Sequence, residues 1–447
     1  MKQPDPVIVV GGGWAGLAAA AELARYDIPV TLLESAKQLG GRARRVPFDN
    51  HDSDGLLGID NGQHILIGAY DSTLDLLRNI GLHEEDVFLR RDLYLRMHPA
   101  QGRPIRMKTG KTPAPLHLLK GLITASGLSL RDKYKAISFS AALSRTDFKL
   151  EEDLTCLSLF KRYRQSDKLI KAIWEPLCLG ALNTHIDEAS AEIFLRVLRD
   201  AFTHNRANSN YLFPKTDLGR VLPDPALDYI EKNGGSIKLA QRVTRLEFSG
   251  QSVSGVATEE QTYQAPYIIL ATPYGVTQQL IREHESLHTI AGQLQQLTSN
   301  PIVTVYLQFP PEVHLKHEML GLVYSTSQWV IDRRICQQPG LLAVVISGSG
   351  PHMKLHNDEL TAHVLRELRQ QIAALPDPLH SMVIREKRAT FHCRTGVNAI
   401  RPANRTPVNG LLLAGDYTNT ELPATLESAV RSGVRCAKII LNMQTNG

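Results

Sequence analysis

The chain has 447 residues, of which 50 are basic and 45 acidic, and its formal net charge is +5. A single hydrophobic core stops growing at roughly 250 to 300 residues, so this length predicts two domains. The charge is too small to indicate a nucleic-acid partner. The sequence contains no run of roughly 18 uncharged apolar residues, so we predict no membrane span.

The five cysteines form no Cys-x-x-Cys pair, and no histidines stand at metal-ligand spacing, so we predict no metal site. An odd number of unpaired cysteines is typical of a reducing compartment, so a cytoplasmic location is expected. The apolar start at residues 7–21 contains glycines and is followed at once by Glu22, which argues against a signal peptide.

The first predicted element is a β-branched strand at residues 7–10, followed by Gly11-Gly12-Gly13-Trp14-Ala15-Gly16 and a helix with a small apolar face. Gly11 permits a tight turn, Gly13 lets the backbone approach a pyrophosphate, and Gly16 lets the helix pack against the strand. Trp14 and Ala15 lie where the helix begins, with its N-terminal amides toward the phosphates. This pattern predicts a dinucleotide site.

A second strand at residues 30–33 ends in Glu34, about 20 residues after the glycines, where a carboxylate can bind ribose hydroxyls. NAD and FAD would both suit this arrangement. A second glycine turn, Gly40-Gly41-Arg42-Ala43-Arg44, then stands where a simple nicotinamide domain would continue into a helix and a third strand. Arginines bind phosphate oxygens and stack on flat rings, so this turn favours FAD over a merely solvated basic loop.

The C-terminal region contains an apolar strand at residues 410–413 that leads into Ala414, Gly415 and Asp416. Asp416 can accept hydrogen bonds from a polyol. A helix that begins near Pro423 can direct its N-terminal amides at the N1/O2 edge of a flavin. The two chain ends are therefore predicted to hold one FAD, and without covalent attachment because this loop lacks cysteine.

These motifs resemble the amine oxidase and phytoene desaturase superfamily of flavoproteins. The resemblance implies that Gly11, Gly13, Gly16, Glu34, Gly41 and Arg42 contact the AMP and pyrophosphate half of FAD, with Trp14 and Ala15 in the same turn. It implies that Gly415 and Asp416 contact the ribityl and phosphate groups, with Thr425 and Leu426 beside the ring. Val243, in a strand-like segment at residues 241–248, matches the position that bonds the adenine, and residues 268–273 match the strand that closes this half.

Longer strings, at residues 60–70, 174–178, 181–184 and 385–391, look like the squalene-associated flavoproteins, which are similar to bacterial hydroxysqualene dehydroxylases. The resemblance implies that an allylic hydroxyl leaves as water and that reduced flavin N5 delivers hydride, which yields squalene for the squalene and hopanoid pathways. Such chemistry needs a weak acid and a dry apolar cavity.

The expected fold is α/β with two domains. A discontinuous Rossmann-like FAD domain is assigned to residues 1–80, 220–285 and 395–447, and a mixed α+β substrate domain to residues 81–219 and 286–394. The substrate is expected where the two domains meet. Asn61, Gln63 and His64 are the catalytic candidates, together with Asn183 and Thr184. Their alternative role is to hold loops against the FAD domain.

Residues 103–149 contain ten basic residues and two acidic ones, interleaved with apolar stretches. A basic helical hairpin with apolar faces can lie on an anionic bilayer, so peripheral contact with the inner face of the cytoplasmic membrane is one interpretation. A solvated basic surface over an ordinary core is the other. A nucleic-acid role is disfavoured because few aromatic side chains are present.

A reductase needs electrons, and residues 344–350 offer the best second fingerprint. It fails, because Met353 replaces the third glycine and Pro351 follows the turn. An external reductant is therefore expected, either NAD(P)H that visits the flavin or another protein. Upstream squalene-pathway enzymes are possible partners. The alternatives are an oxidative C30 or C40 isoprenoid desaturase, an amine oxidase, for which the C-terminal loop offers only Tyr417 as a cage residue, and a non-enzymatic flavin-containing prenyl-lipid carrier.

Overall fold

A five-stranded parallel sheet forms one end of the molecule in the computed structural model, which describes residues 4–48, 57–99 and 102–445. Its strand order is β10-β2-β1-β14-β20, with strands from three distant parts of the chain: β1 (Val7–Val10), β2 (Val30–Leu33), β10 (Ser236–Lys238), β14 (Tyr267–Leu270) and β20 (Leu411–Leu413). In register, Val7 faces Val30 on one side and Tyr267 on the other. The strands predicted at residues 7–10 and 30–33 are confirmed, and the one predicted at residues 410–413 is confirmed with its start at residue 411.

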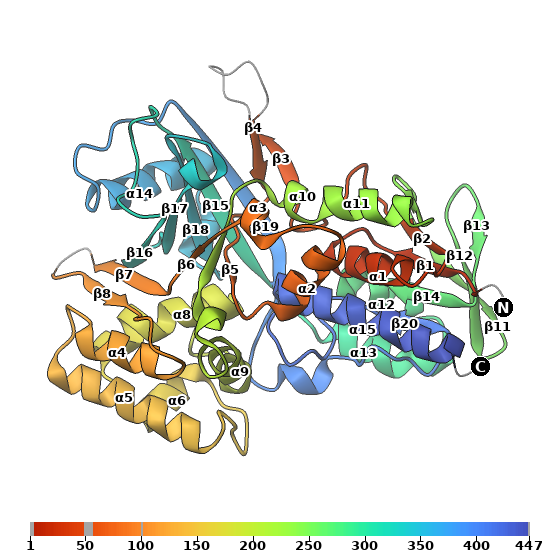
Figure 1. The fold of residues 1–447 in the computed structure, drawn as a ribbon, viewed down its shortest axis with the longest axis horizontal. Coiled ribbons are helices and arrows are strands. Elements are labelled where there is room, and N and C mark those ends of the chain that lie inside the picture. The colour runs from red at the N-terminus through yellow and green to blue at the C-terminus, as the bar shows by residue number, and fades with distance from the viewer. Residues whose placement is uncertain (1–3, 49–56, 100–101, 446–447) are drawn as a thin grey trace.

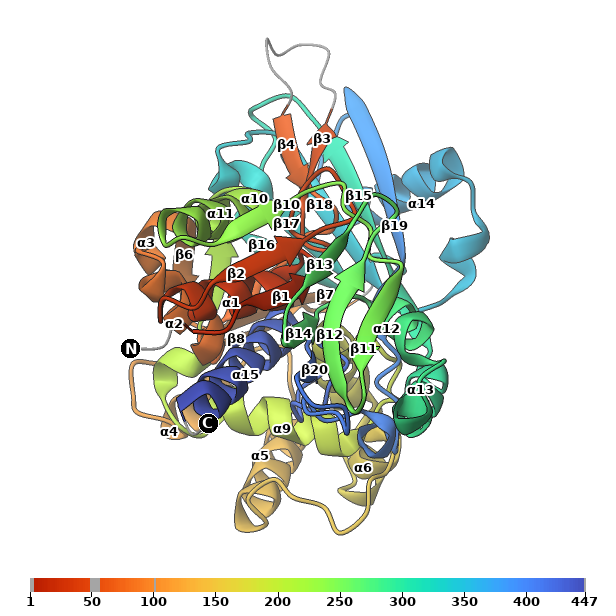
Figure 2. The same cartoon turned by 90° about the vertical axis from the view of Figure 1, so that its right-hand side faces the viewer.

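Two helices from opposite chain ends pack together beside this sheet, α1 (Trp14–Ala24) and α15 (Leu426–Thr445) (Figures 1 and 2). Their separation is set by Gly433, because a Cβ there would lie 2.0 Å from the backbone oxygen of Ala15. The remaining helices of this half are α2 (Asp71–Asn79), α3 (Glu84–Val87), α10 (Leu218–Val221), α11 (Pro223–Lys232), α12 (Tyr274–Ile281) and α13 (His288–Gln295), with 3₁₀ turns η3 (Glu285–Leu287) and η6 (Val397–Ile400).

The described residues also form three small sheets. They are β11-β12-β13 (Arg245–Ser249, Ser252–Ala257, Thr262–Gln264), β3-β4 (Arg45–Phe48, Leu57–Asp60) and β5-β9-β6 (Leu66–Ile67, Tyr211–Pro214, Phe88–Arg91). The strand expected over residues 241–248 begins only at Arg245. The preceding segment instead bonds the second strand's end, since Gln241 N–H donates to the Glu34 carbonyl at 2.8 Å.

A seven-stranded mixed sheet forms the second half, in the order β19-β15-β18-β17-β16-β7-β8. The strands are β7 (Tyr94–Pro99), β8 (Ile105–Lys108), β15 (Ser299–Gln308), β16 (Met319–Val323), β17 (Trp329–Asp332), β18 (Leu341–Ser347) and β19 (His380–Phe391). One face is covered by α14 (Asn357–Arg369), whose Leu360 and Val364 join the core of the sheet. The segment 344–350 lies in this antiparallel region and leads into a 3₁₀ turn, η5 (Pro351–Lys354), rather than a phosphate-binding helix.

A group of helices completes the second half at the end of the molecule opposite the two termini (Figure 1). It consists of α4 (Leu116–Thr124), α5 (Leu130–Arg145), α6 (Cys156–Arg162), α7 (Asp167–Leu169), the π-helix η1 (Ile170–Trp174), α8 (Glu175–Leu182), α9 (Ala191–Phe202) and η2 (Arg206–Ser209), while η4 (Arg333–Cys336) follows β17. The expectation that residues 103–149 form one helical hairpin is wrong at its start, because Ile105 and Met107 alternate inward from β8. No helix among the described residues is both long and apolar enough to cross a bilayer.

Candidate active site

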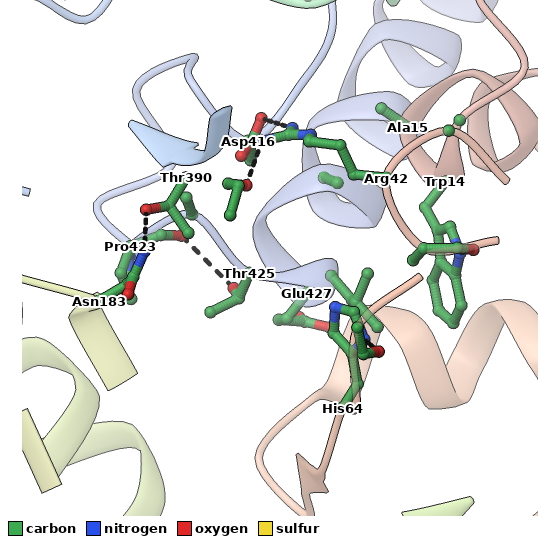
Figure 3. A pocket seen from close by; sticks show the side chains of 18 of the residues that line it. Trp14, Ala15, Arg42, His64, Asn183, Thr390, Asp416, Pro423, Thr425 and Glu427 are labelled. Carbon is green, nitrogen blue, oxygen red and sulfur yellow. Dashed lines mark hydrogen bonds and ion pairs between the residues drawn. The ribbon is translucent and has the colours of Figure 1, made fainter. Parts of the chain in front are cut away.

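One cavity of about 860 Å³ runs between the two halves of the molecule. Its wall includes both glycine turns, the start of α15, the 61–67 segment, and parts of α8, α9 and the seven-stranded sheet. Figure 3 shows its interior, with Arg42 and Asp416 joined at the top, Asn183 and Thr390 joined at the left, and Thr425 between them and His64. A cavity of this shape can hold a long cofactor at one end and a substrate at the other.

The two glycine turns pack against each other at one end of the cavity. Gly11 has φ +111°, and a Cβ on Gly16 would lie 1.9 Å from the Gly11 oxygen, so neither position tolerates a side chain. Gly13 pairs with Gly40, and Gly41 lies directly against Gly13. The wall here is therefore bare backbone, which is what close approach by a pyrophosphate requires.

Helix α1 begins at this turn without a side-chain cap. Its first amides, at Trp14, Ala15 and Gly16, precede the first helical hydrogen bond, in which Leu17 N–H donates to the Gly13 carbonyl. Trp14 and Ala15 line the cavity, and the indole of Trp14 donates to the Ala43 carbonyl, so it fixes the second glycine turn. Free amides at a helix N-terminus form a site for anions.

Glu34 lines the cavity at the end of β2. One carboxylate oxygen accepts from Gly12 N–H at 2.6 Å, and the other accepts from Ala36 N–H at 2.7 Å. The second oxygen also accepts from Ser35 Oγ at 3.1 Å, so the oxygen that bonds Gly12 is the one that keeps a further lone-pair direction for a ribose hydroxyl. Glu34 therefore also fixes the first glycine turn, a role that the sequence reasoning missed.

Arg42 and Asp416 form an ion pair that joins the two chain ends, with Nη2 to Oδ1 at 2.6 Å (Figure 3). Arg42 Nη1 also donates to the Ala389 carbonyl at 2.7 Å. Gly415 lies next to Asp416 on the cavity wall, and its amide donates to Ser432 Oγ of α15. The two residues that the sequence assigned to pyrophosphate and ribityl thus lie side by side.

The start of α15 lies on the same wall. Thr425 Oγ1 accepts from Ser428 N–H at 3.1 Å, so this side chain caps the helix. The amides of Leu426 and Glu427 make no hydrogen bond with described residues and remain available to a ligand. Burial and the neighbouring Glu427 raise the pKa of Tyr70, whose hydroxyl bonds Thr425.

Val243 lines the far end of the cavity, beside Gln241 and Arg242. Its backbone N–H and carbonyl make no hydrogen bond with any described residue. Val243 is therefore placed where two free backbone groups could bond an adenine edge.

Asn61, Gln63 and His64 come together on the cavity wall, and each has a protein partner. Asn61 Nδ2 donates to Glu386 Oε2 at 3.1 Å, and Gln63 Oε1 accepts from Arg333. His64 Nδ1 lies 2.6 Å from the Gly62 carbonyl, so its Nε2 bears a lone pair when the ring is neutral. Burial lowers the pKa of His64, which favours the neutral ring.

A buried polar network that sequence reasoning missed stands behind Gln63. Arg333 and Asp60 are both sealed from solvent, and Arg333 Nη1 lies 3.3 Å from Asp60 Oδ2. Asp60 Oδ1 accepts from Leu218 N–H, and Asp60 O accepts from the Tyr306 hydroxyl. Burial raises the pKa of Asp60, and the guanidinium of Arg333 opposes that shift. The network connects the second half to the loop that presents Gln63.

The side chains of Asn183 and Thr184 are hydrogen-bonded to other parts of the protein. Asn183 Nδ2 donates to Thr390 Oγ1 at 2.9 Å, and its Oδ1 accepts from Gly348 N–H at 2.7 Å. Thr184 Oγ1 accepts from Cys393 N–H. Trp174 is buried in the core, where it stacks on Phe160, and Trp329 lines the cavity.

The part of the wall contributed by residues 81–219 and 286–394 is mostly apolar, with Leu177, Phe194, Trp329 and Ile331 among its members. The titratable residues on that part of the described wall are Asp200, Tyr211 and Glu386. Asp200 pairs with Arg196, and Glu386 bonds Asn61. The Tyr211 hydroxyl has no partner among the described residues, and burial raises its pKa, so it stays protonated.

A family model described as flavin containing amine oxidoreductase matches residues 14–441. The chain belongs to that family. It is 26% identical to the hydroxysqualene dehydroxylase of Zymomonas mobilis, over 97% of this chain and 98% of that one. It is 22% identical to the chloroplastic/chromoplastic 15-cis-phytoene desaturase of Solanum lycopersicum, over 98% of this chain and 78% of that one.

Among solved structures, cyclohexylamine oxidase from Brevibacterium oxydans superposes with a TM-score of 0.73 at 16% identity, covering 99% of this chain and 100% of that one. Family membership makes this chain a flavin-dependent oxidoreductase. The residues present suit a flavin dinucleotide, because bare backbone, two free helix N-termini and the Arg42–Asp416 pair all line the same cavity. No group of histidine, cysteine or carboxylate side chains suited to a metal occurs among the described residues.

Proposed function

We propose that this protein binds FAD non-covalently and catalyses the reductive dehydroxylation of hydroxysqualene to squalene. The observation that supports it most is the cavity between the two halves, in which a dinucleotide cradle continues into a mostly apolar chamber whose wall includes the Tyr211 hydroxyl, unpartnered among the described residues. The similarity to hydroxysqualene dehydroxylases over almost the whole chain supports the choice of substrate.

The cofactor would be held by three parts of the chain. Gly11, Gly13, Trp14, Ala15, Gly16 and Gly41 would surround the pyrophosphate. Glu34 and Val243 would bind the adenosine, and Arg42, Gly415 and Asp416 the phosphate and ribityl groups. Thr425 and Leu426 would lie at the ring, where free amides stabilise negative charge. The proposed FAD domain comprises residues 1–80, 220–285 and 395–447, and the substrate domain comprises residues 81–219 and 286–394.

The reaction replaces a C–O bond by a C–H bond, so one hydride and one proton enter and one water leaves. FAD, when bound and reduced, would supply the hydride. The protein would supply a dry apolar wall, which excludes water from the reacting carbon. Asn61, Gln63 and His64 remain the predicted residues beside the reacting centre.

Tyr211 is the group best placed to hold the departing hydroxyl. It is protonated, it faces the cavity, and it lies opposite Ile67 in the β5–β9 pair, three residues from His64. A phenol is a weak acid, which suits an allylic leaving group that departs easily. Neutral His64 would accept a hydrogen bond at Nε2 rather than donate a proton.

The partners follow from the chemistry. The electrons would come from an external reductant, NAD(P)H or a separate reductase. A substrate this apolar resides in lipid, so the protein would work at the inner face of the cytoplasmic membrane, downstream of enzymes that make the hydroxylated isoprenoid.

The test is anaerobic. The purified protein is reduced with dithionite, mixed with hydroxysqualene in detergent, and followed by flavin absorbance and by mass spectrometry of the product. We expect reoxidation with one equivalent of squalene. Reduced flavin that stays unchanged with hydroxysqualene would contradict the proposal, and it would support a prenyl-lipid carrier if no isoprenoid changes the flavin in either direction.

An isoprenoid desaturase is the second candidate, because the phytoene desaturase relative also matches nearly all of this chain. It would use the same cavity in the oxidative direction. Bleaching of the oxidised protein by squalene or phytoene, with no reaction of the reduced protein, would favour it. For an amine oxidase the predicted cage residue Tyr417 would have to face the substrate, and Tyr417 does not line the cavity.

A further inference from the structure

The helices α4 and α5 present an unusual concentration of exposed apolar side chains. Ten large apolar side chains are exposed among the described residues, and five of them lie on these two helices: Leu116, Leu119, Ile123, Leu130 and Tyr134. Leu130 is 84% exposed and Tyr134 is 73% exposed. Scattered exposed residues need no explanation, but a cluster of this kind marks a surface that contacts something apolar.

The five side chains are spaced to form one surface. Leu116, Leu119 and Ile123 stand at positions i, i+3 and i+7 of α4, whose opposite face buries His117, Gly121 and Leu122. Leu130 and Tyr134 stand at i and i+4 of α5. Lys133 Nζ donates to the Ile123 carbonyl at 2.7 Å, which joins the end of α4 to the first turn of α5. We call these five residues the α4–α5 apolar face.

The charge around this face is mainly basic. Lys120 and Arg131 are exposed beside it, and Lys111 precedes α4. The two acids of residues 103–149 are both engaged, because Asp132 is buried in the cap of α5 with Ser129, and Asp147 pairs with Arg199 at 3.1 Å. Asp167 is exposed near the first turn of α5, because it follows Ser166, whose Oγ donates to Asp132, and the exposed Lys168 stands next to it in the chain.

The same helix lies against the cavity wall. Buried His117 of α4 bonds Ser209 Oγ at 3.1 Å, and Ser209 lines the cavity together with Tyr211. The inner face of α4 is thus one hydrogen bond from the predicted substrate chamber, while its outer face is the exposed apolar one.

We propose that the α4–α5 apolar face docks on an anionic lipid bilayer, with Lys120 and Arg131 at the headgroups and the chamber wall at Ser209 turned toward the lipid. Apolar side chains would enter the headgroup boundary, Tyr134 would occupy the interface, and the cations would contact anionic headgroups. That the lipid also delivers the substrate rests on the proposed function.

The experiment compares three full-length proteins in co-sedimentation with vesicles of phosphatidylcholine and phosphatidylglycerol at three to one. Leu119→Ser/Ile123→Ser/Leu130→Ser removes three residues of the face. The matched control, Tyr26→Ser/Leu239→Ser/Leu379→Ser, removes three exposed apolar side chains elsewhere. Circular dichroism and flavin content verify that all three are folded.

We expect the wild type and the control to bind these vesicles equally and the face variant to partition about tenfold less. Lys120→Ala and Arg131→Ala should each weaken partitioning about fivefold, and less at high salt. Failure of the wild type to bind, or equal binding by the face variant, would overturn the proposal.

A parallel assay separates docking from chemistry, because detergent-dispersed hydroxysqualene needs no membrane. Squalene formed in detergent by a protein that ignores vesicles refutes docking and keeps the proposed function. Vesicle binding that depends on the face, by a protein that makes no squalene in detergent, supports docking and refutes the function.

Discussion

The two ends of the cavity are built from different materials. At the dinucleotide end much of the wall is backbone, with the glycine turns at Gly11–Gly13 and Gly40–Gly41 and the free amides of α1 and α15, beside a few charged side chains. At the substrate end it is side chain, mostly apolar, and its polar groups other than Tyr211 are largely engaged with the protein. Backbone groups at the first end determine which class of cofactor can bind. Apolar side chains at the second end determine the shape of the substrate that fits, and they leave few polar atoms that could take part in the reaction.

The two ends meet at the loop of residues 60–64, and Arg333 holds that loop from behind. We expect Arg333→Met to lower the free energy of unfolding by about 3 to 5 kcal/mol, because it leaves the carboxylate of Asp60 buried and unpaired. Urea titration of the flavin-bound protein measures the change. Arg78→Met, which breaks an exposed pair with Asp75, is the control and should cost less than about 1 kcal/mol.

The double variant Arg333→Met/Asp60→Asn sharpens this test. It removes both charges and keeps an oxygen that can accept from Leu218 N–H. If the double variant recovers much of the stability that Arg333→Met loses, the loss in the single variant is due to the unpaired Asp60 carboxylate. An Arg333→Met protein as stable as the wild type would show that the network does not join the two ends.

The substrate end of the cavity is tested most directly by a substitution at Tyr211. We expect Tyr211→Phe to slow squalene formation by the reduced protein about a hundredfold or more, because the departing hydroxyl loses its proton donor. Single-turnover flavin reoxidation measures the rate. Tyr94→Phe is the control, since the ring of Tyr94 packs against Tyr211 with centroids 5.7 Å apart while its hydroxyl bonds Glu318 outside the cavity. Equal rates for both variants would remove Tyr211 from the chemistry.

The difference between the two ends of the cavity also explains which features could be predicted from the sequence. Glycine turns after the strands at residues 7–10 and 30–33 were predictable, because they need backbone geometry that few other residues can adopt. Asp416 was predictable because an acid after an apolar strand can accept hydrogen bonds from a polyol. Arg333 and Gln63 are 270 residues apart in the sequence, and the fold of the mixed sheet brings them together. No local sequence pattern predicts that contact. The strand at Ile105–Lys108 did have a signal in the sequence, its alternating apolar and basic residues, which the structure buries and exposes in turn.

The backbone end is tested by its two acids. Glu34→Ala and Asp416→Ala should each weaken FAD retention by about 1 to 3 kcal/mol. The Glu34 variant loses the bond to Gly12 N–H and the proposed bond to the ribose, and the Asp416 variant leaves Arg42 without its partner. Titration of the apoprotein with FAD, followed by fluorescence, measures both. Asp224→Ala, at an exposed pair with Arg45, should bind FAD normally. Unchanged affinity in both site variants would refute the placement of the two chain ends.

The smallest expected effect concerns His64, where the two ends touch. Burial lowers its pKa in the folded protein, so between the ordinary histidine value and that lower value the unfolded chain binds a proton that the folded protein does not. Stability should therefore fall as the pH is lowered through this window, by at most about 1.4 kcal/mol per pH unit for one group. His64→Gln should remove this part of the pH dependence, which urea titrations at pH 5.5 and 7.5 would show.

The same variant distinguishes the two candidate acids. If neutral His64 only accepts a hydrogen bond, His64→Gln should change the single-turnover rate a few fold and leave its pH profile flat between pH 6 and 8, because the phenol of Tyr211 stays protonated there. If an imidazolium is the acid, the wild-type rate should rise as the pH falls toward the lowered pKa of His64, and this rise should vanish in the variant. That outcome would assign the role of proton donor to His64 instead of Tyr211. The chamber wall around Tyr211 would then serve only to keep the site apolar.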